Sequence, residues 1–209
     1  MAGSASPLIG VLALQGGFEA HERMLAKLGP NPPRTREVRV PPDLDGLDGL
    51  VVPGGESTTM TLGIEREGLA EPLRELAARG TPIMGSCAGL IMLDRDHLGL
   101  MEMRAERNAF GRQIRSFEAD VTIAGMQGPP IRGIFIRAPW IAEHGPDVEI
   151  LGEVDDHGVA ARQGRTLAVA FHAELGDDDR LHRLFLDWVL EASASGQQRA
   201  IAPGAGEGR

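Results

Sequence analysis

Three short apolar runs in the first half of the chain each lead into a glycine turn and then into a helical pattern. They are LIGVLAL (8–14), LDGLVVPGGEST (47–58) and TPIMGSC (81–87). Continuous apolar strands of this length are typical of parallel sheets that are buried on both faces. Repetition of strand, glycine turn and helix therefore predicts an α/β fold, with a mostly parallel, doubly wound sheet and helices on both faces.

The segments between these runs carry the helix signals. Ser57 or Thr58 has the chemistry of a helix N-cap, and Gly80 has that of the residue that closes a helix. PNPPRTR (30–36) is proline-rich and is expected to form a loop before a second strand at 37–40. The helices are predicted over 18–28, from the Ser57–Thr58 cap, over 71–79, over 88–94 and over 179–194.

The character of the chain changes from about Ala119. Closely spaced strand candidates follow one another: DVTIAG (120–125), IRGIFIRA (131–138), VEILGEV (148–154), GVAARQG (158–164) and TLAVAFH (166–172). Some are expected to form antiparallel hairpins at the edge of the sheet. We predict one domain over residues 1–194 and a disordered tail over 195–209, where apolar residues are too few to pack.

Composition narrows the classes of function. The chain has 209 residues, a formal net charge of −9 and a single cysteine. Excess negative charge argues against nucleic acid or an anionic membrane as a partner, and one cysteine cannot form an internal disulfide. The N-terminus lacks the pattern of a signal peptide, and no apolar run approaches the roughly 18 residues of a membrane span. A cytoplasmic protein is expected.

The single cysteine, Cys87, lies in Gly85-Ser86-Cys87-Ala88-Gly89. This is the spacing of a nucleophile elbow, a sharp strand-to-helix turn that presents one side chain at the edge of a sheet. Flanking glycines relieve the crowding of such a turn, and the helix N-terminus favours a thiolate. The alternative is an inert buried thiol, the commoner fate of a lone cysteine.

A thiol nucleophile needs a base, and the base needs an orienting group. His172 and Glu174 follow the buried run LAVAF, and residues two apart on an extended chain project to the same side. We therefore predict that Glu174 orients His172 toward Cys87. The remaining histidines are assigned to surface or packing roles: His21, His97, His144, His157 and His182. No cluster has metal-ligand spacing, so no metal site is expected.

Acyl transfer also needs donors for an oxyanion. Gly54 and Gly55 directly follow a buried strand, where exposed amides can face a substrate carbonyl, although a tight turn alone would also explain them. The chain has no phosphate-binding loop pattern.

Together GSCAG (85–89), PGGESTT (53–59) and FHAEL (171–175) resemble the class I, triad-type glutamine amidotransferases. Further blocks are very similar to one branch of them, the glutaminase subunits of two-subunit pyridoxal phosphate synthases. These blocks are GVLALQGGFEAH (10–21), PGGESTTM (53–60), ERNAFGRQ (106–113), SFEAD (116–120), GIFIRAPWI (133–141) and AARQG (160–164). The resemblance covers residues from about 8 to 190.

The resemblance implies hydrolysis of L-glutamine through a cysteinyl thioester and delivery of ammonia to a barrel-type synthase subunit, with no cofactor of its own. It implies that Cys87 is the nucleophile, His172 the base and acid, and Glu174 the orienting group. Amides of Gly55 and Ala88 would form the oxyanion hole. Gln15 would contact the partner or the oxyanion region. The implied glutamine-contacting residues are Gly54, Gly55, Glu56, Arg107, Ile136 and Arg137.

Two departures from the family pattern bear on the site. Ala173 stands where the family usually has proline, so the geometry of His172 and Glu174 is expected to be looser. The segment LDRDHLGLM (93–101) is shorter than usual. Rival interpretations are another class I amidotransferase, a γ-glutamyl hydrolase, or a scaffold subunit without catalysis.

Overall fold

The computed structural model describes residues 6–107 and 116–201, and side chains as far as residue 195. The helices are α1 (Phe18–Leu25), α2 (Ser57–Arg66), α3 (Ala70–Ala78), α4 (Ala88–Leu93) and α5 (Arg180–Ile201), with a short 3₁₀ helix η1 (Pro41–Leu44). The strands are β1 (Leu8–Leu12), β2 (Arg34–Val38), β3 (Gly49–Val52), β4 (Ile83–Ser86), β5 (Met103–Glu106), β6 (Ser116–Val121), β7 (Ile131–Ile136), β8 (Trp140–His144), β9 (Glu149–Val154), β10 (His157–Gln163) and β11 (Thr166–Val169).

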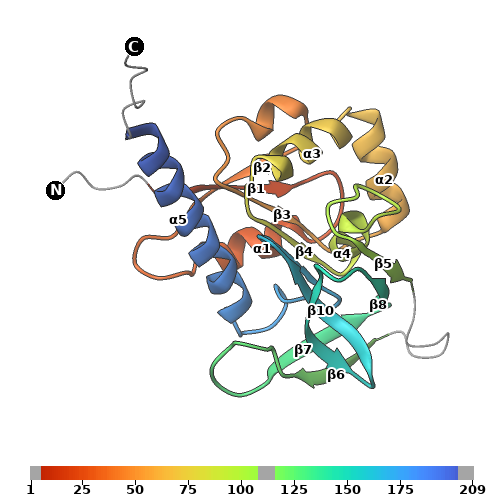
Figure 1. The fold of residues 1–209 in the computed structure, drawn as a ribbon. Coiled ribbons are helices and arrows are strands. Elements are labelled where there is room, and N and C mark those ends of the chain that lie inside the picture. The colour runs from red at the N-terminus through yellow and green to blue at the C-terminus, as the bar shows by residue number, and fades with distance from the viewer. Residues whose placement is uncertain (1–5, 108–115, 202–209) are drawn as a thin grey trace, which may run out of the picture.

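The main sheet has nine strands within the described residues, in the order β2-β1-β3-β4-β11-β10-β8-β5, with β9 paired to β10 (Figure 1). β2, β1, β3, β4 and β11 run parallel to one another. β10, β8, β5 and β9 extend the sheet with antiparallel pairs. Because β4 and β11 are adjacent and parallel, their carboxyl ends meet at one edge of the sheet, which brings distant segments of the chain together.

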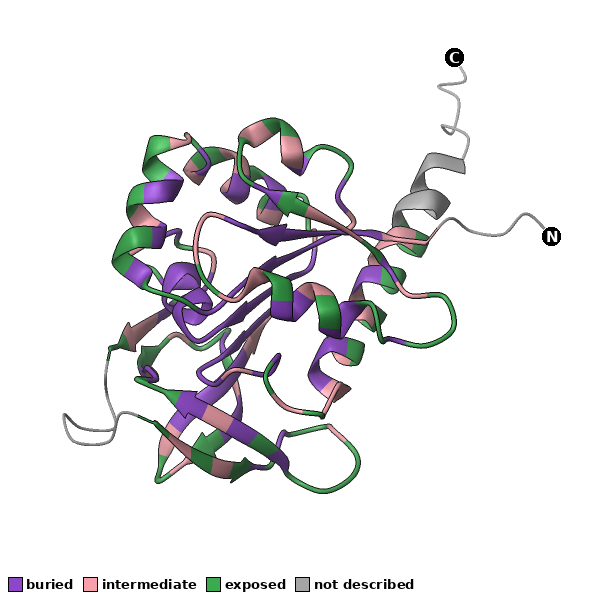
Figure 2. Cartoon of the chain, turned by 180° about the vertical axis from the view of Figure 1, so that it is seen from behind, coloured by how far each residue is buried: buried purple, intermediate pink, exposed green. Residues whose placement is uncertain are grey.

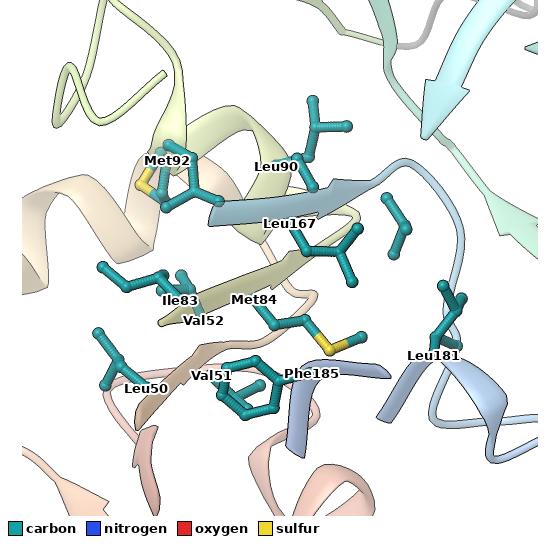
Figure 3. Close-up of a cluster of buried hydrophobic side chains, with 14 of the residues drawn as sticks. Leu50, Val51, Val52, Ile83, Met84, Leu90, Met92, Leu167, Leu181 and Phe185 are labelled. Atoms are coloured by element: carbon teal, nitrogen blue, oxygen red, sulfur yellow. The ribbon is translucent and has the colours of Figure 1, made fainter. Parts of the chain in front are cut away.

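Helices cover both faces of the parallel half. Figure 3 shows Leu90 and Met92 of α4 on one side of the central strands and Leu181 and Phe185 of α5 on the other. α2 contacts α4 on its side, and α1 lies with α5, since the imidazoles of His21 and His182 meet there. The inner parallel strands β1, β3, β4 and β11 are buried along their whole length (Figure 2), whereas the edge strand β2 is buried only at Val38. Burial on both faces explains why these strands read as continuous apolar runs.

A second, two-stranded antiparallel sheet is formed by β6 and β7. The rings of Phe117 and Phe135 stack across it with centroids 4.6 Å apart, and Phe135 also packs on Phe171, which follows β11. The small sheet is thereby anchored beside the carboxyl end of β11.

The predicted doubly wound α/β fold with antiparallel additions is confirmed, and some boundaries were wrong. β2 begins at Arg34, inside the expected proline-rich loop, because pairing with β1 recruits these residues. β5 and β8 were not predicted. α5 continues to Ile201, so residues 195–201, expected in the disordered tail, are helical, whereas 202–209 lie outside the described residues. The division of the chain into one domain and a tail stays a prediction. Among the described helices, none combines the length and apolar character needed to cross a bilayer.

Candidate active site

Cys87 lies at a sharp turn between β4 and α4. Its backbone has φ 50° and ψ −108°, a conformation that costs a non-glycine residue energy and is found mostly at functional sites. The Cys87 amide donates to the Val169 carbonyl at 2.8 Å, which ties the turn to β11. A Cβ on Gly89 would overlap the Val52 carbonyl oxygen, and one on Gly85 would lie 2.8 Å from the Gly89 carbonyl carbon. The predicted elbow is therefore present, and both flanking glycines are sterically required.

His172 and Glu174 lie just beyond β11. The His172 amide donates to the Ile134 carbonyl at 2.9 Å, and its Nδ1 lies 2.7 Å from Glu174 Oε1. β11 ends at Val169, and the Leu175 amide donates to the His172 carbonyl at 3.3 Å. The pair therefore meets within a turn, and the expected extended conformation was wrong. Ala173 in place of proline does not prevent the close pairing.

Gly54 lies against both His172 and Cys87. A Cβ built on Gly54 would lie 2.5 Å from His172 Cε1 and 3.2 Å from Cys87 Cβ. A side chain at this position would displace one of the two groups. Because glycine is present, the loop after β3 can approach both of them.

The electrostatics of the three side chains are coupled. Burial opposes a charge on His172, but hydrogen bonds to Cys87 and Glu174 outweigh it and raise the pKa of His172 to about 10. Burial likewise opposes the charge on Glu174, yet the hydrogen bond with His172 and the adjacent His21 hold the pKa of Glu174 below its usual value. An imidazolium between a sulfur and a carboxylate is thus favoured at neutral pH.

The loop after β3 is held by the loop after β1. The Gly17 amide donates to the Gly54 carbonyl at 2.9 Å, and the Glu56 amide donates to Gln15 Oε1 at 2.7 Å. Because a trans peptide directs its C=O and N–H to opposite sides, the Gly55 N–H points away from Gly17. Gln15 therefore fixes the backbone of the loop, whereas the resemblance implied a contact with the partner or the oxyanion region.

Glu56 is the N-cap of α2, and the predicted cap at Ser57 or Thr58 was wrong. Its carboxylate accepts from the amides of Thr58 at 3.0 Å and Thr59 at 2.7 Å. The hydroxyl and amide of Thr59 and the amide of Thr58 lower the pKa of Glu56 to about 2. The Glu56 carboxylate is therefore ionised and oriented at the rim of the site.

A cavity of about 410 Å³ opens in front of Cys87 and His172. It is lined by both of these residues and by Gly55, Glu56, Ser57, Ala88, Ile91, Arg107, Ile136, Arg137 and Pro139. Ser57, Ile91 and Pro139 were not predicted, and no signal in the sequence distinguished them. Gly54, Glu174 and Gln15 do not line the cavity; they support the residues that do. A larger cavity of about 520 Å³, beside α5 and residues 124–127, contains none of the predicted residues.

Two exposed arginines flank the cavity. Arg107 donates to Thr58 Oγ1 at 3.2 Å, and its other terminal nitrogen lies 3.2 Å from His97 Nε2. Arg137 directly follows β7 and has φ 47°, a left-handed backbone value that is uncommon for residues other than glycine. The Ile136 carbonyl oxygen lies 3.8 Å from Cys87 Sγ. The rest of the ERNAFGRQ block, from residue 108, lies outside the described residues.

No group of three or more His, Cys, Asp or Glu side chains is arranged to hold a metal ion in the described part of the chain. The chemistry available is that of a thiol, an imidazole and a carboxylate beside a cavity with cationic groups at its rim. This combination on a doubly wound sheet defines the class of triad-type glutamine amidotransferases.

Comparison with known proteins identifies the family within that class. Residues 11–191 match the SNO glutamine amidotransferase family, and the chain belongs to it. It is 46% identical over 202 residues to the pyridoxal 5'-phosphate synthase subunit PdxT of Frankia alni, covering 92% of this chain and 100% of the relative. It is 51% identical over 191 residues to the PdxT subunit of Geobacillus thermodenitrificans, covering 88% of this chain and 96% of the relative.

Solved structures with the same fold are consistent with this family. A crystal structure described as a glutamine amidotransferase superimposes with a TM-score of 0.79 at 42% identity, covering 87% of this chain and 98% of that one. The structure of PurLQS from Thermotoga maritima has a TM-score of 0.67 at 18% identity, covering 93% of this chain and 100% of the matched one; this likeness concerns the fold alone.

Proposed function

We propose that this chain is a glutaminase that supplies ammonia to a synthase subunit making pyridoxal phosphate, in vitamin B6 biosynthesis. The observation that carries the proposal is the assembly of Cys87, His172 and Glu174 at a cavity large enough for an amino acid. The family of the chain and the names of its relatives support both the reaction and the pathway.

The reaction starts from the protonated imidazole of His172 and uses Cys87 as its nucleophile. The Cys87 thiolate attacks the side-chain amide carbon of glutamine, and the imidazolium of His172 gives its proton to the departing nitrogen. Ammonia leaves and a thioester remains. His172, now neutral, takes a proton from water, whose oxygen attacks the thioester carbon. Glutamate leaves and the thiolate–imidazolium pair is restored. Glu174 holds Nδ1, so Nε2 carries the transferred proton.

Amides of Gly55 and Ala88 are suited to stabilise the tetrahedral intermediate, because both residues line the cavity beside Cys87. The substrate head group carries a carboxylate and an ammonium. Arg107 and Arg137 supply guanidinium groups for the carboxylate, and Glu56 supplies an ionised carboxylate for the ammonium.

Ammonia is useful to a synthase only while it is unprotonated and shielded from water, which is the chemical reason for a docked partner. By its resemblance to the family, that partner is a barrel-type subunit, and this chain needs no cofactor of its own. The net charge of −9 supports a partner other than nucleic acid or an anionic membrane, and the single cysteine supports a reducing compartment such as the cytoplasm.

The test is glutamate release from L-glutamine by the chain alone and with a pyridoxal phosphate synthase subunit, with Cys87→Ala as the control. We expect turnover that the partner stimulates and that Cys87→Ala abolishes. Turnover by Cys87→Ala would exclude the thioester mechanism. If the wild type releases no glutamate either alone or with the synthase subunit, the proposed function is refuted.

A further inference from the structure

Two buried histidines that the mechanism does not use lie directly behind Glu174. His21 of α1 and His182 of α5 are both 0% exposed, and His21 Nδ1 lies 2.9 Å from His182 Nε2. On its other side, His21 Nε2 lies 2.9 Å from Ser86 Oγ and 3.3 Å from Glu174 Oε2. A continuous line of polar contacts therefore runs from α5 through α1 to the carboxylate that holds His172.

Burial is the largest influence on both imidazoles. It lowers the pKa of His182 to about 3 and also lowers the pKa of His21, where the attraction of Glu174 does not compensate. Both rings are therefore neutral at neutral pH, and each carries one N–H. A single proton occupies the 2.9 Å contact between them.

The position of that proton is fixed by Glu174. If His21 carried its proton on Nδ1, the lone pair of Nε2 would face an ionised carboxylate oxygen at 3.3 Å. With the proton on Nε2, the N–H faces Ser86 Oγ and Glu174 Oε2, and His21 Nδ1 accepts from His182 Nε2–H. His182 Nδ1 is then a bare acceptor, in accordance with its lack of a hydrogen-bond partner among the described residues. Only this arrangement makes every contact in the line favourable.

Glu174 needs such support. Its Oε1 is engaged by His172, but its Oε2 is buried and has no hydrogen bond of good geometry within the described residues. The N–H of the neutral His21 ring, at 3.3 Å, is the partial positive charge that this oxygen meets on the side away from His172. A buried carboxylate oxygen without a nearby donor would favour protonation of Glu174, which would then hold His172 less firmly.

We propose that His21 and His182 are positioning residues for the glutaminase reaction. His182 fixes the tautomer of His21, and the His21 N–H stabilises Glu174 as an oriented carboxylate, which in turn orients His172. The proposal rests on the proposed function for the assignment of His172 and Glu174. The charged and titratable groups that face this line are His172 and Glu174 at one end and Asp179, before α5, at the other.

The variants that test the proposal separate a hydrogen-bond donor from packing. His21→Leu keeps bulk and removes the donor, and His21→Gln places an amide N–H near the position of Nε2. His182→Leu removes the group that fixes the tautomer. Leu25→Ala is the matched control, because Leu25 is a fully buried residue of the same helix, α1, and none of the contacts above involves it.

Two readouts are required. The first is kcat and KM for glutamate release with the synthase subunit present. The second is the rate at which iodoacetamide alkylates Cys87, from about pH 5 to about pH 9. The chain has one cysteine, so alkylation reports on this thiol alone. The second readout needs neither glutamine nor the partner, so it tests the positioning role even if the proposed function fails.

We expect His21→Leu to lower kcat by about tenfold or more with little change in KM. The pH of half-maximal alkylation should rise by roughly 0.5–1 unit, because a less stabilised carboxylate supports the imidazolium less well. His21→Gln should recover most of both effects. For His182→Leu, both effects should be intermediate between those of the wild type and those of His21→Leu. Wild-type alkylation and turnover in His21→Leu would overturn the proposal. An equal alkylation shift in Leu25→Ala, or no recovery in His21→Gln, would likewise overturn it by assigning the effect to packing.

Discussion

The protein should lose stability on mild acidification because of His182. This imidazole is fully buried in α5, and its pKa in the fold is about 3, against about 6.5 for an ordinary histidine. Burial is the main cause of the difference, and the adjacent His21 adds to it. The folded protein therefore keeps His182 neutral at pH values at which the unfolded chain protonates it.

The sign follows from proton linkage. Below about pH 6.5 the unfolded state binds a proton at His182 that the folded state does not, so stability falls as the pH falls. The contribution is fully present above pH 6.5 and is lost progressively down to the folded pKa of about 3. At about 1.4 kcal/mol per pH unit, acidification to pH 5 should cost about 2 kcal/mol through this residue.

The assay is urea unfolding at pH 7.5 and pH 5, at constant ionic strength, for the wild type and His182→Gln. The variant cannot titrate at this position. Between pH 7.5 and pH 5 its free energy of unfolding should therefore fall by about 2 kcal/mol less than that of the wild type. Any packing cost of the substitution is present at both pH values and cancels in this difference. His144→Gln, which removes an exposed histidine, is the control and should behave as the wild type. Equal losses in the wild type and His182→Gln would refute the reasoning.

Three further substitutions test the geometry of the site and the core. Gly54→Ala would place a methyl group 2.5 Å from His172 Cε1, so we expect a loss of glutaminase activity of about 100-fold or more with an unchanged circular dichroism spectrum. Gly89→Ala would overlap the Val52 carbonyl oxygen and should lower the thermal midpoint as well as the activity. Phe185→Ala removes a fully buried ring beneath the central strands and should cost about 3–5 kcal/mol by urea unfolding, with KM unchanged if the protein folds.

The parts of the fold that could be predicted are those that local physics determines. A strand buried on both faces must be apolar throughout, so β1, β3, β4 and β11 are visible in the sequence. β8 was missed because Ile141 alone is buried in WIAEH, and its last three residues, Ala142, Glu143 and His144, are exposed in the antiparallel extension of the sheet. Its pairing with β5 and β10 is a long-range event without a local signature.

The same distinction applies to the site. The elbow at Cys87 could be predicted because its glycine spacing is a local pattern of five residues, although the contact that requires Gly89 is made with Val52, at the end of β3 and far away along the chain. The N-cap of α2 was misassigned because serine and threonine are the commoner caps, whereas the Glu56 carboxylate is drawn onto two amides by the turn that Gln15 holds from another loop. The contact that decides the cap comes from Gln15, far away along the chain, so residue preference alone predicted a cap one or two residues too late.

His21 and His182 show why such contacts escape prediction. Both were assigned to surface or packing roles, since a helical histidine among polar neighbours has no local pattern that indicates a function. They lie 161 residues apart, and only the crossing of α1 and α5 on one face of the sheet brings them together. Their tautomers depend on a carboxylate contributed by a third segment, beyond β11. A line of buried polar groups that spans three segments is specified by topology and charge together, so its function can be inferred only after the sheet has been assembled.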